Sequence, residues 1–404
     1  MILIEEALQL IDAQASPLAP TKIAVTQSLG TVLAEDVCSD IDSPPHDKAM
    51  MDGYAILAED LQQGKAQLKI IEEVTAGQVP TKALSSGEAT RIMTGAPVPT
   101  GATAVVMIER TTVADDSPEL VAINDASIVA GKNIMLQATS LKTGQVVLPK
   151  GTLIRPIEIG ILSEVGRVEV LVQPRPSLAV LCTGNELVSP EIKPGPGIIR
   201  NSNGPMLSAQ AQNVGAEVHY LGIGRDDEAE LKSLITQGLQ HDVLVLSGGV
   251  SAGVLDLVPK LLADQDVKQV FHKVSIKPGK PIWFGVKDHG DRKTLVFGLP
   301  GNPVSSMVCF ELFVRQAIGK LLGRSDQALG TVKTRLAQEF THRGNRPTLF
   351  PAKLIQQEDQ KIVSPINWKG SADLGSLTNA DVLIYFPGGD HVYAVDDEVD
   401  ALIL

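Results

Sequence analysis

Residues 242–263 read DVLVLSGGVSAGVLDLVPKLLA. The run DVLVLSGG is short, apolar and bounded by glycines, which predicts a buried strand, and VLDLVPKLLA after it predicts a helix. A strand that is apolar throughout and leads into a helix is typical of a parallel sheet covered on both faces. Strands and helices should therefore alternate on either side of this stretch.

The alternation does extend in both directions. Upstream we expect strands at SLAVLCTG (177–184) and EVHYLGIG (217–224), and helices after Asn201-Ser202-Asn203 and at DDEAELKSLITQGL (226–239). Downstream we expect a hairpin through residues 270–287, a strand at TLVFGLPG (294–301) and a helix from Pro303 to about Leu322. This order predicts a mostly parallel, doubly wound α/β domain over residues 176–326.

The flanking regions have a different character. Residues 1–15 predict an amphipathic helix, and a short helix is expected near residues 156–165. Residues 45–150 and 327–404 carry short apolar runs separated by glycine and proline turns, which predicts β-rich structure in both. The fold class is therefore multidomain α/β plus β.

The composition excludes several classes of protein. The 404 residues carry a formal net charge of −12 and only 3% aromatic residues, which disfavours binding to duplex or single-stranded nucleic acid. The three cysteines form no CxxC pair, and we expect reduced thiols. No signal peptide and no apolar run of about 20 residues is visible. We expect a cytoplasmic protein with no nucleic-acid or membrane partner.

Three of the predicted strands end in turns rich in glycine, and ligands of open parallel sheets bind beyond the carboxyl ends of the strands. Glycines let backbone N–H groups approach a phosphate, although tight packing also explains such turns. The candidate phosphate-binding residues are Thr183, Gly184, Ser247, Gly248, Gly249, Ser251, Pro300, Gly301 and Asn302.

Acidic residues follow the same strand ends. Glu186 and Asp256 are candidate ligands for Mg²⁺, a cation that prefers oxygen ligands, but acids in the first turn of a helix are equally common. Asp226 and Asp227 open a predicted helix, where capping is the ordinary role.

Lysines cluster in HKVSIKPGKP, residues 272–281. Lys273 and Lys277 lie four residues apart, which on a strand would place both on one face, and Lys280 follows. Solvated hairpin lysines explain such a run, but in an acidic protein these three could bind a multiply charged anion. The sequence by itself thus predicts a phosphorylated or anionic ligand held with a divalent cation.

Six motifs extend this interpretation. They are AMMDGYA (49–55), RIMTGAPVPTGATAVVMIE (91–109), CTGNEL (182–187), LSGGVSAGVLD (246–256), KVSIKPGKPIWFG (273–285) and GLPGNPVSS (298–306). Taken singly, the segments around Asp52-Gly53 and Thr94 are also consistent with surface turns. Together and in this order, the motifs resemble those of the molybdopterin molybdenumtransferases, the family of bacterial MoeA and of the gephyrin E domain.

The resemblance implies four domains. Residues 1–44 and 141–175 would form a discontinuous N-terminal linker and dimerisation domain, into which the β-rich domain 45–140 is inserted. Residues 176–326 would form the molybdopterin-binding α/β domain and 327–404 a small β-barrel-like domain. The protein would be a homodimer with each site shared between the α/β domain of one subunit and the β domains of the other.

The resemblance also implies a reaction. Mg²⁺ would be the cofactor, molybdate and molybdopterin adenylate the substrates, AMP and the molybdenum cofactor the products, and the molybdopterin adenylyltransferase a possible partner. Carried over by motif, the catalytic candidates are Asp52, Thr94, Glu186, Asp226, Asp256, Lys273 and Lys277, with Lys280, Arg346 and Ser371 binding the cofactor. The C-terminal residues depart most from the family pattern. Where the family has a C-terminal Gly-Arg motif, this sequence has Gly344-Asn345-Arg346-Pro347.

Three alternatives remain open. A sister fold adenylylates molybdopterin, and a related domain occurs in a nicotinamide-nucleotide amidase. Ser247-Gly248-Gly249-Val250-Ser251 departs from the Gly-Gly-Thr-Gly form of the adenylyltransferase. A scaffold protein that keeps the fold without catalysis is the third, and hydrolysis of the adenylate would distinguish it.

Overall fold

A computed structural model describes residues 1–249, 257–324, 329–357 and 360–404 of the chain. The chain forms two compact units. The first unit contains residues 1–23, 28–34 and 171–404, and the second contains residues 24–27 and 35–170. The finer division into four domains stays a prediction.

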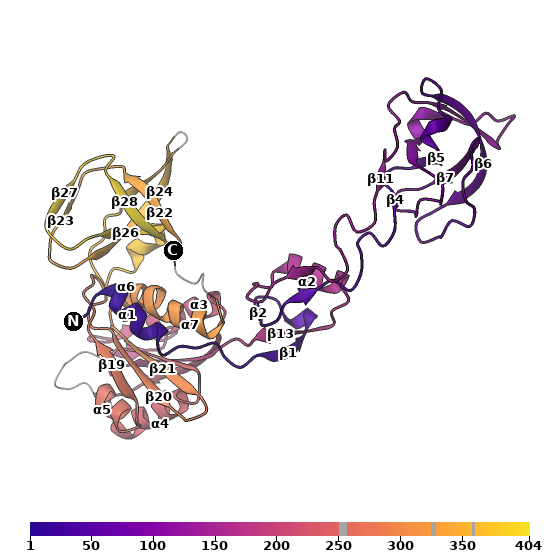
Figure 1. Ribbon diagram of the computed structural model, residues 1–404. Coiled ribbons are helices and arrows are strands. Elements are labelled where there is room, and N and C mark those ends of the chain that lie inside the picture. Colours follow the sequence, from indigo (N-terminus) through magenta and orange to yellow (C-terminus); the bar gives the residue numbers. More distant parts are fainter. Residues whose placement is uncertain (250–256, 325–328, 358–359) are drawn as a thin grey trace. The chain divides into compact units, whose positions relative to one another are not determined.

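A sheet with the strand order β17-β14-β18-β21-β20-β19 is the centre of the first unit (Figure 1). β14, β17, β18 and β21 pair in parallel, whereas β20 and β19 add to the edge in antiparallel fashion. The bounds are Ser177–Thr183 for β14, Glu217–Gly224 for β17, Val243–Ser247 for β18, Lys268–His272 for β19, Trp283–Asp288 for β20 and Lys293–Leu299 for β21. Every residue of β18 is buried, as its apolar sequence predicts.

Helices cover both faces of this sheet (Figure 1). One face carries α1 (Ile4–Asp12), α3 (Asn203–Asn213), α6 (Pro303–Cys309) and α7 (Arg315–Leu321), and the other carries α4 (Glu228–Gly238) and α5 (Leu257–Ala263). On the second face, Leu231, Ile235 and Leu261 pack with Leu244 and Leu246 of β18 in one core. The predicted doubly wound α/β architecture is confirmed. The long helix expected after Pro303 is interrupted by a π-helical turn at Phe310–Val314.

The lysine-rich segment does not form a strand. β19 ends at His272 and β20 begins at Trp283, so residues 273–282 connect the two strands as a loop. Lys273 has a φ of +71°, which interrupts an extended backbone. Lys273 and Lys277 therefore do not lie on a strand, which was the condition for placing both on one face. Two short parallel strands, β15 (Leu187–Val188) and β16 (Ile199–Arg200), were also not predicted.

The C-terminal part of the first unit is a closed barrel. Its order is β22 (Thr331–Leu336), β25 (Gln360–Pro365), β24 (Thr348–Gln357), β26 (Val382–Phe386) and β28 (Glu398–Ile403). β23 (Phe340–His342) pairs with β27 (His391–Tyr393) beside it. Phe386 is buried and stacks on Phe340 with ring centroids 4.4 Å apart. The small all-β barrel expected here is confirmed.

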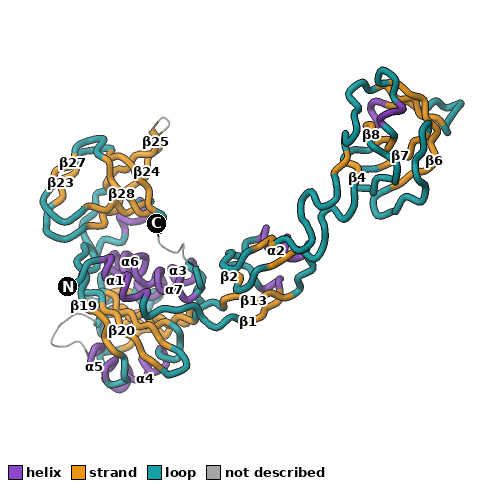
Figure 2. Tube along the Cα trace, viewed as in Figure 1, coloured by secondary structure: helices purple, strands orange, loops and turns teal. Residues whose placement is uncertain are grey.

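The second unit is β-rich, with long loops between short strands (Figure 2). Its main sheet has the order β8-β5-β7-β6-β10-β9. The bounds are Gly53–Ile56 for β5, Lys65–Val74 for β6, Glu88–Ile92 for β7, Ala104–Met107 for β8, Thr111–Thr112 for β9 and Leu120–Asn124 for β10. Tyr54, Leu68 and Val106 contribute to its core. The absence of a long helix from the described residues 45–150 agrees with the sequence.

Smaller elements complete the chain. One two-stranded sheet pairs β4 (Lys48–Ala49) with β11 (Ile134–Met135), and another pairs β3 (Val37–Cys38) with β12 (Val146–Leu148). A three-stranded sheet has the order β1 (Thr21–Ala24), β13 (Glu169–Gln173) and β2 (Val32–Leu33). The helix α2 (Pro156–Glu164) lies where a short helix was expected. Short 3-10 turns occur at Val25–Gln27, Ala58–Asp60, Ile108–Arg110 and Gly375–Asn379.

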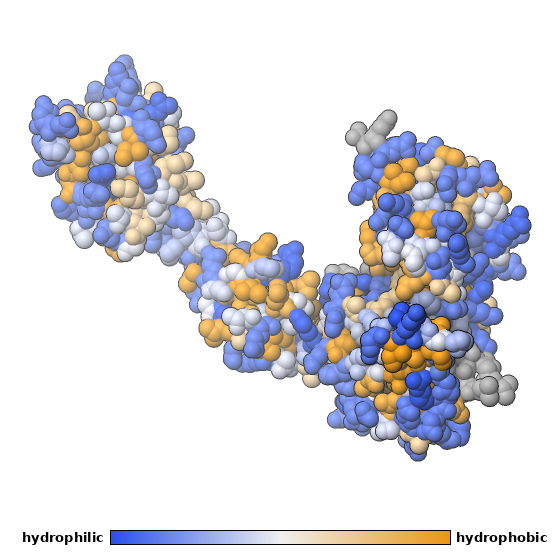
Figure 3. Space-filling view, turned by 180° about the vertical axis from the view of Figure 1, so that it is seen from behind, coloured by the Kyte–Doolittle hydropathy of each residue, from blue (hydrophilic) through white to orange (hydrophobic). Residues whose placement is uncertain are grey.

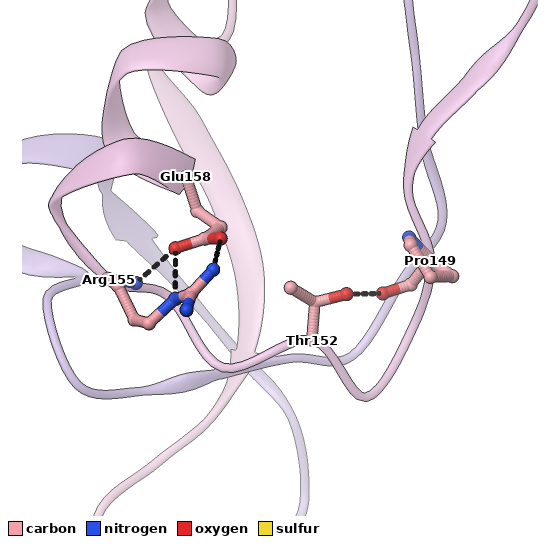
Figure 4. A network of polar contacts seen from close by, with 4 residues as sticks. All are labelled: Pro149, Thr152, Arg155 and Glu158. Carbon is pink, nitrogen blue, oxygen red and sulfur yellow. Dashed lines mark hydrogen bonds and ion pairs between the residues drawn. The ribbon is translucent and has the colours of Figure 1, made fainter.

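The N-terminus of α2 is fixed by a polar network (Figure 4). Glu158 is buried. Its carboxylate accepts a hydrogen bond from the backbone N–H of Arg155 (2.9 Å) and another from Nη2 of the Arg155 guanidinium (2.6 Å). The side-chain contact with Arg155 lowers the pKa of Glu158 to about 2, against the opposing effect of burial.

On the face that Figure 3 shows, hydrophilic areas alternate with hydrophobic areas on both units. Within the described ranges, the most exposed large apolar side chains are Val168, Val79 and Ile157. Among the described helices, none combines the length and apolar character needed to cross a membrane.

Candidate functional site

The sheet topology creates a crevice beside β14. The crossover through α3 leads to β17 on one side of β14, and the crossover through α4 returns to β18 on the other side. In open α/β sheets, ligands bind outside the carboxyl ends of the strands at such a reversal. A cavity of about 820 Å³ lies there, lined by the turns that follow β14, β17, β18 and β21.

The structure brings together the described residues that were predicted at these strand ends. Those that line the cavity are Thr183, Gly184, Glu186, Asp226, Ser247, Gly248, Gly249, Pro300, Gly301 and Asn302. The candidates Ser251 and Asp256 lie outside the described residues. The prediction that separate strand-end turns converge is thus met for the part of the chain that can be described.

Position 248 requires a glycine for a structural reason. Its φ is +91°, and a Cβ at this position would lie 2.5 Å from the carbonyl oxygen of Thr183. Such a contact is impossible without a backbone shift, so only glycine allows the turns after β14 and β18 to approach this closely. A Cβ on Gly301 would in turn lie 3.9 Å from the Cα of Gly248, so the turn after β21 packs against the same point.

Two described carboxylates line the cavity. A Cβ on Gly184 would lie 2.4 Å from Oε2 of Glu186, so this glycine leaves the space that the carboxylate occupies. The backbone N–H of Asp226 donates to Oδ1 of Asn185 at 3.1 Å. Asp227 caps α4 by accepting from the N–H of Glu230 at 2.9 Å, so the expected capping role belongs to Asp227 and not to Asp226. Among the described residues, no three acids, histidines or cysteines gather as a metal cluster.

Asn203 also lines the cavity, and it connects the turns that follow β18 and β21. Its Nδ2 donates both to Oγ of Ser247 (2.8 Å) and to the carbonyl oxygen of Gly301 (2.8 Å). The sequence indicated this residue only as part of the segment that precedes a predicted helix. The capping bond at α3 is made by Asn201, whose Oδ1 accepts from the N–H of Gly204 at 3.0 Å.

A thiol also belongs to the cavity wall. Cys182 is the penultimate residue of β14 and is fully buried. Burial raises the pKa of the Cys182 thiol to about 11. Burial and the nearby Cys182 together raise the pKa of Tyr220 to about 12. Both groups are therefore neutral at physiological pH.

A second cavity of about 700 Å³ lies between residues 277–281 and the barrel. The predicted residues Lys277, Lys280, Arg346 and Ser371 line it, and so do two cations that the motifs did not indicate, Arg343 and Lys369. No acid is among its described lining residues. Its cationic lining suits an oxyanion.

Several hydrogen bonds hold the walls of this second cavity in place. Arg346 donates from Nη1 to the carbonyl oxygen of Ile276 at 2.8 Å. The backbone of Lys277 donates to Pro347 and accepts from Leu349, each at 2.8 Å, so the loop is joined to β24. Asn302 donates from Nδ2 to Oγ of Ser371 at 3.0 Å and lines both cavities, as Pro300 does. The two cavities therefore share a wall.

Lys273 is not brought into either cavity. Its backbone N–H donates to Ile282 at 2.8 Å, and its carbonyl oxygen accepts from Ile2 at 3.2 Å. The structure therefore separates Lys273 from Lys277, with which it was grouped in sequence.

The predicted pair Asp52 and Thr94 lies within the second unit. Oδ1 of Asp52 accepts from both the backbone N–H and the Oγ1 of Thr94, each at 2.7 Å. These bonds, the backbone one first, lower the pKa of Asp52. These bonds join two segments that are 42 residues apart in the sequence.

Comparisons with known proteins cover nearly the whole chain. Three family models match: the MoeA N-terminal region (domain I and II) at residues 2–166, a probable molybdopterin binding domain at residues 179–320 and the MoeA C-terminal region (domain IV) at residues 333–404. The molybdopterin molybdenumtransferase of Staphylococcus aureus is 33% identical over 405 residues, covering 99% of this chain and 95% of that protein. The Staphylococcus epidermidis protein of the same name is 32% identical over 407 residues, covering 100% of this chain and 95% of that protein.

The fold agrees with the sequence comparison. The crystal structure of the molybdopterin biosynthesis MoeA protein from Pyrococcus horikosii matches with a TM-score of 0.81 and 31% identity, covering 100% of this chain and 99% of that one. The resemblance inferred from six motifs therefore holds along the full length of the chain, which belongs to the MoeA family of molybdopterin molybdenumtransferases.

Proposed function

We propose that this protein inserts molybdate into molybdopterin adenylate, with release of AMP, as the last step of molybdenum cofactor synthesis. One observation carries the proposal. The cavity at the strand ends, which suits a phosphorylated ligand, shares Pro300 and Asn302 with a cationic cavity that suits an oxyanion. A transfer between an adenylylated pterin and molybdate requires two such sites side by side.

The strand-end turns would hold the pyrophosphate. Gly248 and Gly249 remove side chains from the turn after β18, so that backbone N–H groups can reach phosphate oxygens. Asn302 directly precedes α6, whose N-terminus adds a partial positive charge.

The described residues fit a magnesium ion. Glu186 and Asp226 line the cavity, and the third candidate, Asp256, lies outside the described residues. Mg²⁺ commonly takes one or two carboxylates and completes its shell with phosphate oxygens and water, so a three-carboxylate cluster is not required. When bound, the ion would neutralise charge on the phosphate oxygens as the pyrophosphate bond breaks.

Lys277, Lys280, Arg346 and Ser371 would hold molybdate in the second cavity. Their positive charges and hydrogen-bond donors match an oxyanion. Lys273 remains a candidate by motif, but its position outside both cavities gives it no structural support.

We infer the assembly from the family. The protein would act in the cytoplasm as a homodimer whose sites combine Asp52 and Thr94 of one subunit with the α/β domain of the other. The molybdopterin adenylyltransferase would supply the adenylylated substrate.

The reaction can be tested directly. Purified protein is incubated with molybdopterin adenylate, Mg²⁺ and molybdate, and AMP and active cofactor are measured. We expect both products, and we expect Glu186→Gln to release AMP more slowly. AMP without active cofactor would indicate a hydrolase, and neither product would reject the proposal.

A further inference from the structure

Two buried asparagines at the start of α3 differ in one respect. Asn201 uses both ends of its amide within the protein, because Nδ2 donates to the Tyr220 hydroxyl at 2.8 Å and Oδ1 accepts from Gly204. Asn203 uses only Nδ2. Its Oδ1 is buried and has no hydrogen-bond partner among the described residues. Buried polar atoms are rarely left unpaired, so the exception calls for a physical explanation.

The orientation of the Asn203 amide is fixed by its partners. The carbonyl oxygen of Gly301 can only accept, so it must face the NH₂ group of Asn203. The second N–H is directed to Ser247. Both donors are therefore occupied, and the remaining atom, Oδ1, can only accept a hydrogen bond.

A second buried atom in the same wall also lacks a partner. Oγ1 of Thr183 is unpaired among the described residues, and Thr183 lines the same cavity as Asn203. Asn203 is 8% exposed and Thr183 is 3% exposed, so neither is an ordinary surface group satisfied by bulk water. Two unpaired oxygens in one cavity wall indicate that a bound ligand completes their hydrogen bonding.

We propose that Asn203 determines substrate specificity by accepting a hydrogen bond from an N–H or O–H group of the ligand. This inference rests on the proposed function. A phosphate oxygen cannot donate to Oδ1 and would be repelled by it. Asn203 therefore marks the position of a part of molybdopterin adenylate that carries donors, either the pterin ring or a ribose hydroxyl.

Binding measurements distinguish these two sources. Calorimetry is carried out on the wild type and on Asn203→Ala with molybdopterin, AMP, 2′-deoxy-AMP and 3′-deoxy-AMP. We expect the substitution to weaken one class of probe about 10-fold. If a ribose hydroxyl is the donor, the matching deoxy analogue binds the wild type more weakly and shows no further loss in Asn203→Ala. If the pterin is the donor, only molybdopterin loses affinity.

Asn201→Ala is the matched control. It also removes a buried asparagine that makes bonds at the start of α3, so it should lower Tm as Asn203→Ala does. It should not produce a loss that depends on which donor the probe carries. Should Asn203→Ala fail to fold, Asn203→Ser takes its place, because the shorter side chain cannot present its oxygen at the same point.

Two outcomes would overturn the role of Asn203. One is equal affinity of the wild type and Asn203→Ala for each probe that the wild type binds. The other is a uniform loss for every probe, including both deoxy analogues and molybdopterin, because this would indicate general damage to the wall. Failure of the wild type to bind any probe would instead contradict the proposed function.

Discussion

Lys277 places a positive charge at the boundary between the loop 273–282 and the barrel, where its backbone bonds hold it in position. We expect Lys277→Ala to raise the molybdate concentration that gives half-maximal cofactor formation. One charge-assisted hydrogen bond contributes roughly 1.5–3 kcal/mol, which corresponds to about 10- to 150-fold. The measurement is cofactor formation as a function of molybdate concentration.

The control for this prediction is Lys268→Ala. Lys268 is an exposed lysine of β19 that lines neither cavity, so its removal changes the net charge equally without changing the molybdate requirement. An unchanged requirement in Lys277→Ala would make Lys277 a solvated surface residue.

Substitution of Gly248 and of Gly290 by alanine distinguishes the loss of stability caused by a steric clash from the loss caused by backbone strain. Both have a φ of +91°, but a Cβ on Gly290 would meet nothing within 4 Å. Gly290→Ala should therefore lose about 1–3 kcal/mol of stability from strain alone. Gly248→Ala should lose more and should also slow AMP release, because its Cβ displaces Thr183. Urea unfolding of both variants tests this, and equal losses would show that the close approach at Gly248 is unimportant.

At the scale of elements, α2 depends on a buried carboxylate (Figure 4). The pKa of Glu158 is lowered from 4.5 to about 2 in the folded protein, so its contribution is complete above about pH 4.5 and is lost as pH falls towards 2. We expect Glu158→Gln to lower Tm at neutral pH and to approach the wild type in acid. Tm measured against pH provides the test, with Glu169→Gln on β13, an exposed glutamate, as control. A difference that stays constant with pH would contradict the assignment.

Some structural elements could be predicted from the sequence and others could not. The strands β14, β18 and β21 are apolar runs with glycine turns, and parallel pairing necessarily brings their carboxyl ends to one edge. The hairpin through residues 270–287 was predicted, but the conformation of its loop 273–282 was not, because it depends on bonds to Ile2, Pro347 and Leu349, which are distant in sequence. Asn203 was missed for a similar reason, since its partners Ser247 and Gly301 follow it by 44 and 98 residues. A single sequence carries no local signal for such long-range bonds.

At the scale of the whole molecule, the proposed shared site predicts complementation. Asp52→Ala and Glu186→Gln would each lower the activity of the homodimer, but through different halves of the site. A mixed dimer would then collect both defects in one site and leave the other intact. We expect subunit exchange between the two variants to restore up to half of the wild-type activity per heterodimer. Differently tagged chains confirm the exchange, and a confirmed heterodimer without activity would reject a site that draws Asp52 from the partner subunit.

The buried thiol of Cys182 has a consequence for the metal that the proposed reaction delivers. Thiolates are metal ligands, whereas protonated thiols bind metals poorly. With a pKa of about 11, Cys182 stays protonated near neutral pH, although it lines the cavity that the proposal assigns to molybdopterin adenylate. This sulfur would therefore have to lose a proton before it could compete with the pterin for the metal, which sets a free-energy cost on capture of the metal by the protein.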